Sequence, residues 1–214
     1  NNHNMKKKYN HLKWNKLKSM KRARTNLALS SFVDNKKEYI FVCGGYNDGE
    51  SLKWCELYNF ESNQWQDLPK SMYRHQSAGC CYWPNGNGTN QNSMIVIGGY
   101  PEAKLVEEYS FYKNKWYKLP STQHNHQFLP SIWVYTDPKI NPNGCGILLC
   151  AGNRCNLKPL NDRTATGYIE FFDKRESIQK WHTLYSLRDM VYFGLHCKID
   201  SKEDDGRRVR RIFR

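Results

Sequence analysis

Short apolar runs, each ending in a pair of small residues, recur along the chain between polar, turn-forming stretches. The runs cover residues 40–43, 95–97 and 147–150, and the pairs that follow them are Gly44-Gly45, Gly98-Gly99 and Ala151-Gly152. Runs of this length, bounded by Gly, Asn and Pro, favour strands over helices. The 14% of aromatic residues and the mean hydropathy of −0.84 fit short strands on a polar background. The pattern therefore predicts an all-β chain.

A second pattern, Trp-x-x-Leu, repeats at nearly constant spacing. Its tryptophans are Trp14, Trp65, Trp116 and Trp181, so the successive gaps are 51, 51 and 65 residues. An acidic residue and then an aromatic one precede the last three tryptophans, as Glu56-x-Tyr58, Glu108-Tyr109 and Glu170-Phe171-Phe172. Elements that recur in a fixed order at this spacing indicate a repeat protein, in which each unit buries its apolar faces against its neighbours.

The order of these elements resembles the kelch repeat: an apolar run, Gly-Gly, Glu-x-Tyr, and then Trp-x-x-Leu-Pro. The resemblance covers residues 12–198, and the units that end in Leu68-Pro69 and Leu119-Pro120 match most closely. The last unit departs from the pattern, because Ala151 replaces a glycine and Tyr185 stands in the place of the proline. The resemblance implies a β-propeller, in which each repeat forms one four-stranded blade and the blades close into a ring, commonly of about six.

We therefore predict an all-β, kelch-type β-propeller with about three complete four-stranded blades and partial blades at both ends. The complete blades are expected at residues 25–68, 75–119 and 127–184. Their strands are expected at 25–33, 39–45, 54–60 and 63–68; at 75–83, 93–99, 105–111 and 115–119; and at 127–136, 146–152, 167–172 and 179–184. The rest of a longer propeller is expected to lie outside this chain.

The two ends of the chain carry the expected partial blades. Residues 12–18 are interpreted as the outer strand of a preceding blade, and residues 190–198 as the inner strand of a following one. Residues 1–11 are expected to be a flexible basic segment, and residues 199–214 a basic end that starts a further strand. Open strand edges of this kind pair readily with another chain.

The repeated residues are expected to build the fold rather than to act on a ligand. Glycine lets the chain turn sharply out of a strand and lets another backbone approach closely. Aromatic rings fill the space between blades, while tyrosine hydroxyls and tryptophan N–H groups find hydrogen-bond partners. The residues with this expected structural role are Gly44, Gly45, Tyr58, Trp65, Gly98, Gly99, Tyr109, Trp116, Gly152, Phe172 and Trp181.

The net charge of +13 is concentrated at the two ends of the chain. Residues 1–24 hold nine Lys or Arg and no acidic residue, and residues 201–214 hold six against three acidic residues. Those ends account for 15 of the 33 basic and 3 of the 20 acidic residues, which leaves 18 basic and 17 acidic residues between them. A nucleic-acid-binding domain carries a basic patch on its folded face. We therefore expect no nucleic-acid binding by the folded part.

The eight cysteines form no CxxC pair and no zinc-ligand spacing. The pair His124-x-His126 lies in a polar stretch without a nearby Cys or acidic partner, so neither a metal site nor any other cofactor is expected. No signal peptide and no run of 18 apolar residues stand in the sequence, which predicts a cytoplasmic protein without a membrane segment.

The function that the resemblance implies is non-catalytic protein binding, as a substrate adaptor or a cytoskeletal scaffold. The connections between the second and third strands of a blade, and between successive blades, emerge on one face, where kelch adaptors hold acidic peptides with arginines. An arginine fork suits carboxylate geometry. The expected partner-binding residues are Arg24, Tyr46, Arg74, Tyr100, Asn153 and Arg188, with the arginines interpreted as equivalent positions of successive blades.

Two alternatives remain open from the sequence. A galactose-oxidase-like enzyme carries blades of the same type, but it needs Tyr, His and Cys ligands that converge in one pocket. The basic ends offer the second alternative, in which an acidic partner binds to them without much use of the propeller. BTB or F-box modules would lie outside this chain.

Overall fold

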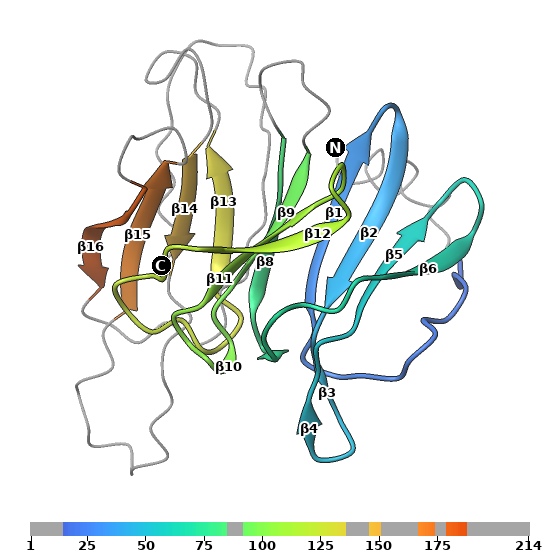
Figure 1. The fold of residues 1–214 in the computed structure, drawn as a ribbon, viewed down its shortest axis with the longest axis horizontal. Helices are drawn as coiled ribbons and strands as arrows, with labels where there is room; N and C mark the ends of the chain where they lie inside the picture. The colour runs from blue at the N-terminus through green and yellow to red at the C-terminus, as the bar shows by residue number, and fades with distance from the viewer. Residues whose placement is uncertain (1–14, 85–91, 136–145, 151–166, 174–178, 188–214) are drawn as a thin grey trace, which may run out of the picture.

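The computed structural model describes residues 15–84, 92–135, 146–150, 167–173 and 179–187. All regular structure in these ranges is β, in three four-stranded antiparallel sheets and two short two-stranded ribbons. Figure 1 shows the three sheets side by side, in chain order from one side of the molecule to the other. Among these residues no helix exists that could cross a membrane.

The first blade has the strand order β1-β2-β5-β6, from the inner strand to the outer one. Its strands are β1 (Ala28–Asp34), β2 (Lys37–Cys43), β5 (Cys55–Asn59) and β6 (Gln64–Leu68). The connection from β2 to β5 carries a hairpin of two short strands, β3 (Tyr46–Asn47) and β4 (Glu50–Ser51).

The second and third blades repeat this topology. The second blade consists of β8 (Gly79–Trp83), β9 (Ser93–Ile97), β11 (Val106–Ser110) and β12 (Lys115–Leu119). The ribbon beside it pairs β7 (His75–Gln76) with β10 (Tyr100–Pro101). The third blade consists of β13 (Ser131–Tyr135), β14 (Gly146–Cys150), β15 (Gly167–Asp173) and β16 (Trp181–Leu187).

The turn between the third and fourth strands is set by an asparagine in the first two blades. Asn63 and Asn114 adopt left-handed φ values of 51° and 50°, a region that asparagine tolerates better than most residues. Their side-chain oxygens accept hydrogen bonds from the hydroxyls of Tyr58 and Tyr109, at 2.6 and 2.7 Å. The repeated tyrosine therefore fixes the turn of its own blade as well as filling the core.

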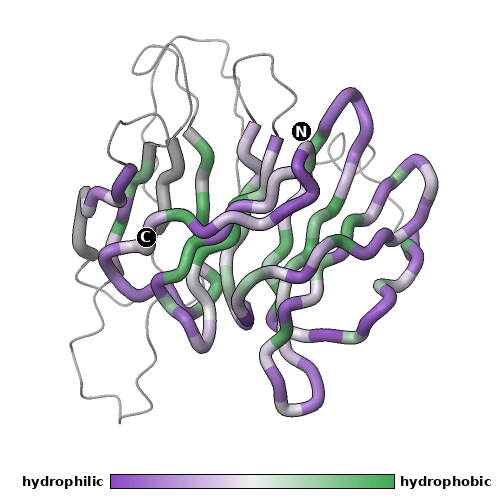
Figure 2. The backbone as a smooth tube through the Cα atoms, in the orientation of Figure 1, coloured by the Kyte–Doolittle hydropathy of each residue, from purple (hydrophilic) through white to green (hydrophobic). Residues whose placement is uncertain are grey.

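The hydrophobic core lies between the blades. One cluster joins the first two blades and includes Phe41, Met94, Tyr109 and Trp116. The other joins the second and third blades around Ile97, Phe172 and Trp181. In Figure 2 the hydrophobic positions follow the strands through the interior, and the hydrophilic ones gather at the turns. Neighbouring blades thus bury each other's faces, as the repeat pattern predicts.

The prediction of a kelch-type all-β fold is confirmed, with small differences at the strand ends. The structure starts the inner strands at Ala28, Gly79 and Ser131, later than the expected 25, 75 and 127. In the first two blades Thr25 and the residues His75–Gln76 pair with the loops instead. Residues 15–18 form no strand, so the expected outer strand at 12–18 is wrong over the part that is described. Residues 1–14 and 188–214 lie outside the described residues, and with them the strands expected at 190–198 and beyond.

Candidate interaction surface

The glycine pairs bring each loop into contact with the next blade. Gly44 and Gly98 have φ values of +64° and +67°, and a Cβ atom on them would lie 1.9 and 2.0 Å from the carbonyl oxygens of His75 and His126. The following glycines, at 45 and 99, donate backbone hydrogen bonds to those same oxygens, at 2.6 and 2.8 Å. Only glycine permits both the backbone conformation and the close approach.

A buried glutamate on the third strand of each blade receives the connection from the preceding blade. The three residues are Glu56, Glu107 and Glu170, all fully buried. Backbone N–H groups of Lys21, Met72 and Gln123 donate to their carboxylates, at 2.9, 2.9 and 2.8 Å. A buried carboxylate is costly unless it is hydrogen-bonded and paired, and a basic side chain lies against the carboxylate at each of the three sites.

The basic side chain of each site comes from the segment that also supplies the backbone N–H groups, and these basic residues recur at a constant spacing. The Arg24 guanidinium binds the Glu56 carboxylate, with both side chains inaccessible to solvent. His75 and His126 take the corresponding places, and their Nε2 atoms lie 2.6 Å from the carboxylates of Glu107 and Glu170. We call this arrangement of glutamate, basic residue and backbone N–H groups the blade junction. Its basic positions are 51 residues apart in both steps.

The electrostatics of the third junction fit an ionised glutamate. Burial by itself raises the pKa of Glu170, but the hydrogen bonds from His126 and from the backbone of Gln123 and His124 lower it, and the net pKa lies below its ordinary value of 4.5. In the second junction, His75 Nδ1 lies 3.0 Å from the Gly98 carbonyl oxygen. Each ring nitrogen of His75 therefore has an oxygen atom within hydrogen-bonding distance.

The repeated tryptophans complete the junctions. The indole N–H groups of Trp65, Trp116 and Trp181 donate to the carbonyl oxygens of Lys18, Pro69 and Pro120, at 2.7, 2.8 and 2.9 Å. Pro69 and Pro120 lie in the segments that leave the outer strands β6 and β12, and Lys18 lies in the segment that leads into the first blade. The residues expected to have a structural role therefore lie in the core or the junctions wherever the structure describes them; Gly152 lies outside the described residues.

Three interpretations of the sequence are corrected by the structure or by the spacing of the residues. Arg24 was expected on the binding surface, but it is buried in the blade junction and is not available to a partner. Arg24, Arg74 and Arg188 are not equivalent positions either, because they follow their tryptophans by 10, 9 and 7 residues. The junction glutamate of the second blade is Glu107 rather than Glu108.

An exposed surface lies at the end of the blades where the connection from β2 to β5 emerges, and the β3–β4 hairpin forms part of it. Asp48 and Gly49 have φ values of +49° and +83°, the combination that a tight two-residue hairpin turn requires. The Ser51 hydroxyl donates to the Gln76 side chain at 2.9 Å, which ties the hairpin to the ribbon of the second blade. Figure 1 places this hairpin and β10 at the same end of the molecule.

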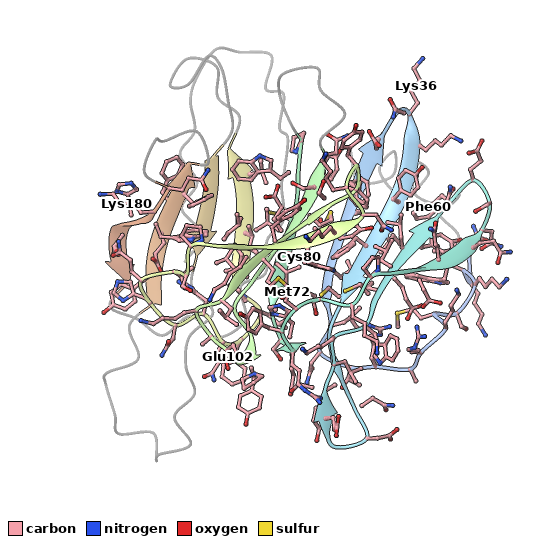
Figure 3. All side chains as sticks on the ribbon, viewed as in Figure 1. Lys36, Phe60, Met72, Cys80, Glu102 and Lys180 are labelled. Carbon is pink, nitrogen blue, oxygen red and sulfur yellow. The ribbon has the colours of Figure 1, made fainter. Side chains whose placement is uncertain are left out.

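Two tyrosines and an ion pair occupy this end. Tyr46 and Tyr100 follow the glycine pairs of successive blades, and they are 37% and 53% exposed. Arg74 reaches the hairpin from the connection between the blades, where its Nη1 atom lies 2.9 Å from Glu50 Oε2 and 2.5 Å from the Ser51 carbonyl oxygen. We call Tyr46, Glu50, Arg74 and Tyr100 the loop surface. In Figure 3, Glu102 marks this end, and Lys36 and Phe60 mark the opposite one.

The structure brings together three of the six residues expected to bind a partner, Tyr46, Arg74 and Tyr100. Asn153 and Arg188 lie outside the described residues. The sequence analysis missed Glu50, which holds Arg74, and the basic histidines of the junctions. The 51-residue spacing of 24, 75 and 126 was the signal that could have found those histidines.

The histidine pair does not form a chelate in this structure. His126 is turned inward to Glu170, whereas the His124 ring stacks on Tyr168 with 3.5 Å between the ring centroids. Burial lowers the pKa of His124, the nearby charges of His126 and Lys104 lower it further, and Glu170 partly opposes them. Across the described ranges, no group of three or more His, Cys, Asp or Glu side chains is arranged to hold a metal ion.

Radially stacked four-stranded sheets with buried aromatic junctions define part of a β-propeller. A family model described as "Kelch motif" matches residues 36–72, which run from the turn between β1 and β2 of the first blade into the connection to the second. The chain is also similar to "Kelch repeat-containing protein kel-10" of Caenorhabditis elegans, at 29% identity over 91 residues. The chain thus carries a kelch motif at residues 36–72, and its fold is that of a partial kelch-type β-propeller.

That match covers 41% of this chain and 14% of the relative, so the chain spans only a small part of the protein it resembles. Kelch repeats generally mediate protein–protein interactions and are generally non-catalytic. The galactose-oxidase-like alternative is not favoured by these similarities.

Proposed function

We propose that the loop surface binds a polypeptide segment that carries a carboxylate, with Arg74 as the charged contact and Tyr46 and Tyr100 on either side. The observation that carries this proposal is the placement of two exposed tyrosines at corresponding loops of adjacent blades, with an arginine between those loops. Tyrosine gives a large contact area at low cost in conformational entropy, and arginine binds carboxylates in a defined geometry.

In this proposal Glu50 regulates binding, because it competes with the partner for Arg74. Its carboxylate holds Arg74 in an ion pair whose side chains are 46% and 67% exposed. An exposed pair of this kind contributes little to stability, so a partner's carboxylate competes with Glu50 at small cost. The role we propose for the protein is that of a substrate adaptor or a cytoskeletal scaffold, in which this surface selects the partner.

The test uses the full-length natural protein as bait and a partner fragment obtained with it. Arg74→Ala should weaken binding about tenfold or more, because a charge-assisted hydrogen bond contributes about 1.5–3 kcal/mol. Glu50→Gln should strengthen binding, because it removes the competing carboxylate. Arg22→Ala is the matched control, since Arg22 is bound to Asp67 and stacks on Trp54, away from the loop surface.

Two results would contradict the proposal. The first is equal affinity of Arg74→Ala and the wild type. The second is loss of binding only when the lysines of residues 6–18 are neutralised, with Arg24 kept because it belongs to the blade junction; that result would assign the interaction to the basic N-terminal segment.

A further inference from the structure

Two cysteines face each other at the base of the β3–β4 hairpin. Cys43 is the last residue of β2 and Cys55 the first of β5, and the two are direct partners across the sheet. Their sulfur atoms lie 3.3 Å apart, and both side chains are completely buried. The whole hairpin, residues 44–54, lies between them in the chain. The corresponding pair in the second blade is Ile97 and Val106, which has no sulfur.

The backbone at this pair has the geometry that a cross-strand disulfide needs. The Gly44 N–H donates to the Trp54 carbonyl oxygen at 2.9 Å, which makes the adjacent Cys43–Cys55 pair one of the close, non-hydrogen-bonded pairs of the ladder. Such partners have Cα atoms about 4.5 Å apart, at the short end of the range that disulfides span. Closing the sulfur separation to about 2.0 Å requires side-chain rotation and only small backbone shifts.

We propose that Cys43 and Cys55 form a reversible disulfide on reaction with a peroxide, and that this bond closes the base of the hairpin. One thiol loses its proton, its thiolate attacks a peroxide oxygen, and the O–O bond breaks to give a sulfenic acid and hydroxide, which takes up the released proton to become water. The second thiol then displaces the sulfenic oxygen as water and forms the S–S bond. In total, two thiols and one hydrogen peroxide give one disulfide and two water molecules, with the sulfur oxidised and the peroxide reduced.

The surroundings of the pair make this reaction slow while the blade is closed. Burial raises the pKa of the Cys43 thiol, and Cys55, Cys80 and Glu107 add to that effect from β5, β8 and β11. Because the thiolate is the reactive form, oxidation should follow local opening of the first blade and should become faster as the pH rises. The disulfide should therefore form only when oxidising conditions persist. This proposal does not depend on partner binding by the loop surface.

The experiment treats the full-length protein with hydrogen peroxide at neutral pH and maps its disulfides by mass spectrometry without reduction. The expected product is a peptide pair joined through Cys43 and Cys55, which thioredoxin or dithiothreitol reverses. Hydrogen exchange of the hairpin amides at 46–51 should slow about tenfold or more in the oxidised protein, since the loop is then closed at its base.

The control variant is Cys80→Ala, which removes the neighbouring, partly buried thiol and should leave the cross-link intact. Cys55→Ala should abolish the cross-link and leave hairpin exchange insensitive to peroxide. A map in which Cys43 or Cys55 is joined to another cysteine, or in which both are still free thiols after the other cysteines have been oxidised, would overturn the proposal. Because the wild-type map requires no substitution, the proposal can be tested even if a variant fails to fold.

Discussion

Arg24 and Arg74 show how differently the same residue type is used in the blade junction and on the loop surface. Both lie in a connection that follows a Trp-x-x-Leu segment, and each contacts a glutamate of the blade beside it. The side chains of Arg24 and Glu56 are fully buried, and the Glu56 carboxylate also accepts a hydrogen bond from the Lys21 backbone N–H. Arg74 and Glu50 are half-exposed or more. Arg24 follows its tryptophan by 10 residues and Arg74 follows its own by 9. This difference of one residue decides whether the side chain points into the junction or toward the loop surface.

This difference in burial implies a division of labour. Removal of one partner of a buried ion pair leaves a charge that neither water nor protein compensates, so the junction determines stability. Exposed ion pairs contribute from about 0 to 1 kcal/mol, so the loop surface is free to exchange its partners. Substitutions in the two regions should therefore separate folding from binding.

The largest expected difference concerns two aromatic residues. Trp116 is buried between the first two blades and donates to Pro69, whereas Tyr100 is mostly exposed. Trp116→Ala should lower the free energy of unfolding by about 3–5 kcal/mol, because it leaves a cavity in the shared core. Tyr100→Ala should change it by about 0.5 kcal/mol or less. Urea unfolding followed by fluorescence measures both; equal effects would mean that the blades do not stabilise each other.

The two glutamates should differ in acid. The pKa of Glu170 is lowered in the folded protein, so its contribution is present above the ordinary pKa of 4.5 and is lost as the pH falls through the folded pKa. Glu170→Gln should flatten the decline of the melting temperature below about pH 4.5. Glu50→Gln, on the loop surface, should leave that acid profile unchanged. An unchanged profile for Glu170→Gln would contradict the assignment of an ionised junction glutamate.

The smallest expected difference involves single hydroxyl groups. Burial raises the pKa of Tyr109 to about 12, and its hydroxyl donates to Asn114. Tyr109→Phe should cost about 0.5–1.5 kcal/mol. Tyr46→Phe, where the ring is partly exposed, should cost less. The third blade carries Phe172 at this position, so it lacks the hydroxyl already. A neutral Tyr109→Phe would show that the turn at Asn114 is fixed without it.

The fold was largely predictable because the repeat fixes it several times over. Each of the apolar runs, glycine pairs and tryptophans has the same structural task in successive blades, so one unit supports the interpretation of the next. The repeat pattern pointed to Glu108 as the acidic residue of the second blade, although its neighbour Glu107 occupies the junction. Alternation along the strand settles the choice, since Glu107 points to the same side as Tyr109, toward the first blade.

The loop surface was less predictable from the sequence, for a physical reason. An exposed charged side chain can pair with several partners at nearly the same energy. The sequence around Arg74 therefore does not indicate that it pairs with Glu50. The basic residue of the junction also changes type, from Arg24 to His75 and His126. An interpretation based on arginines alone therefore pointed to Arg74, the residue next to His75. Register relative to the tryptophan was the more reliable guide.

The most direct test of this division compares the thermal and urea unfolding of Arg24→Ala and Arg74→Ala, with each free energy measured at the same pH and salt. Arg24→Ala should lose about 3–5 kcal/mol, because Glu56 is left buried and unpaired. Arg74→Ala should remain within about 0.5 kcal/mol of the wild type. Equal losses, or a larger loss for Arg74→Ala, would contradict the assignment of one arginine to the fold and the other to binding.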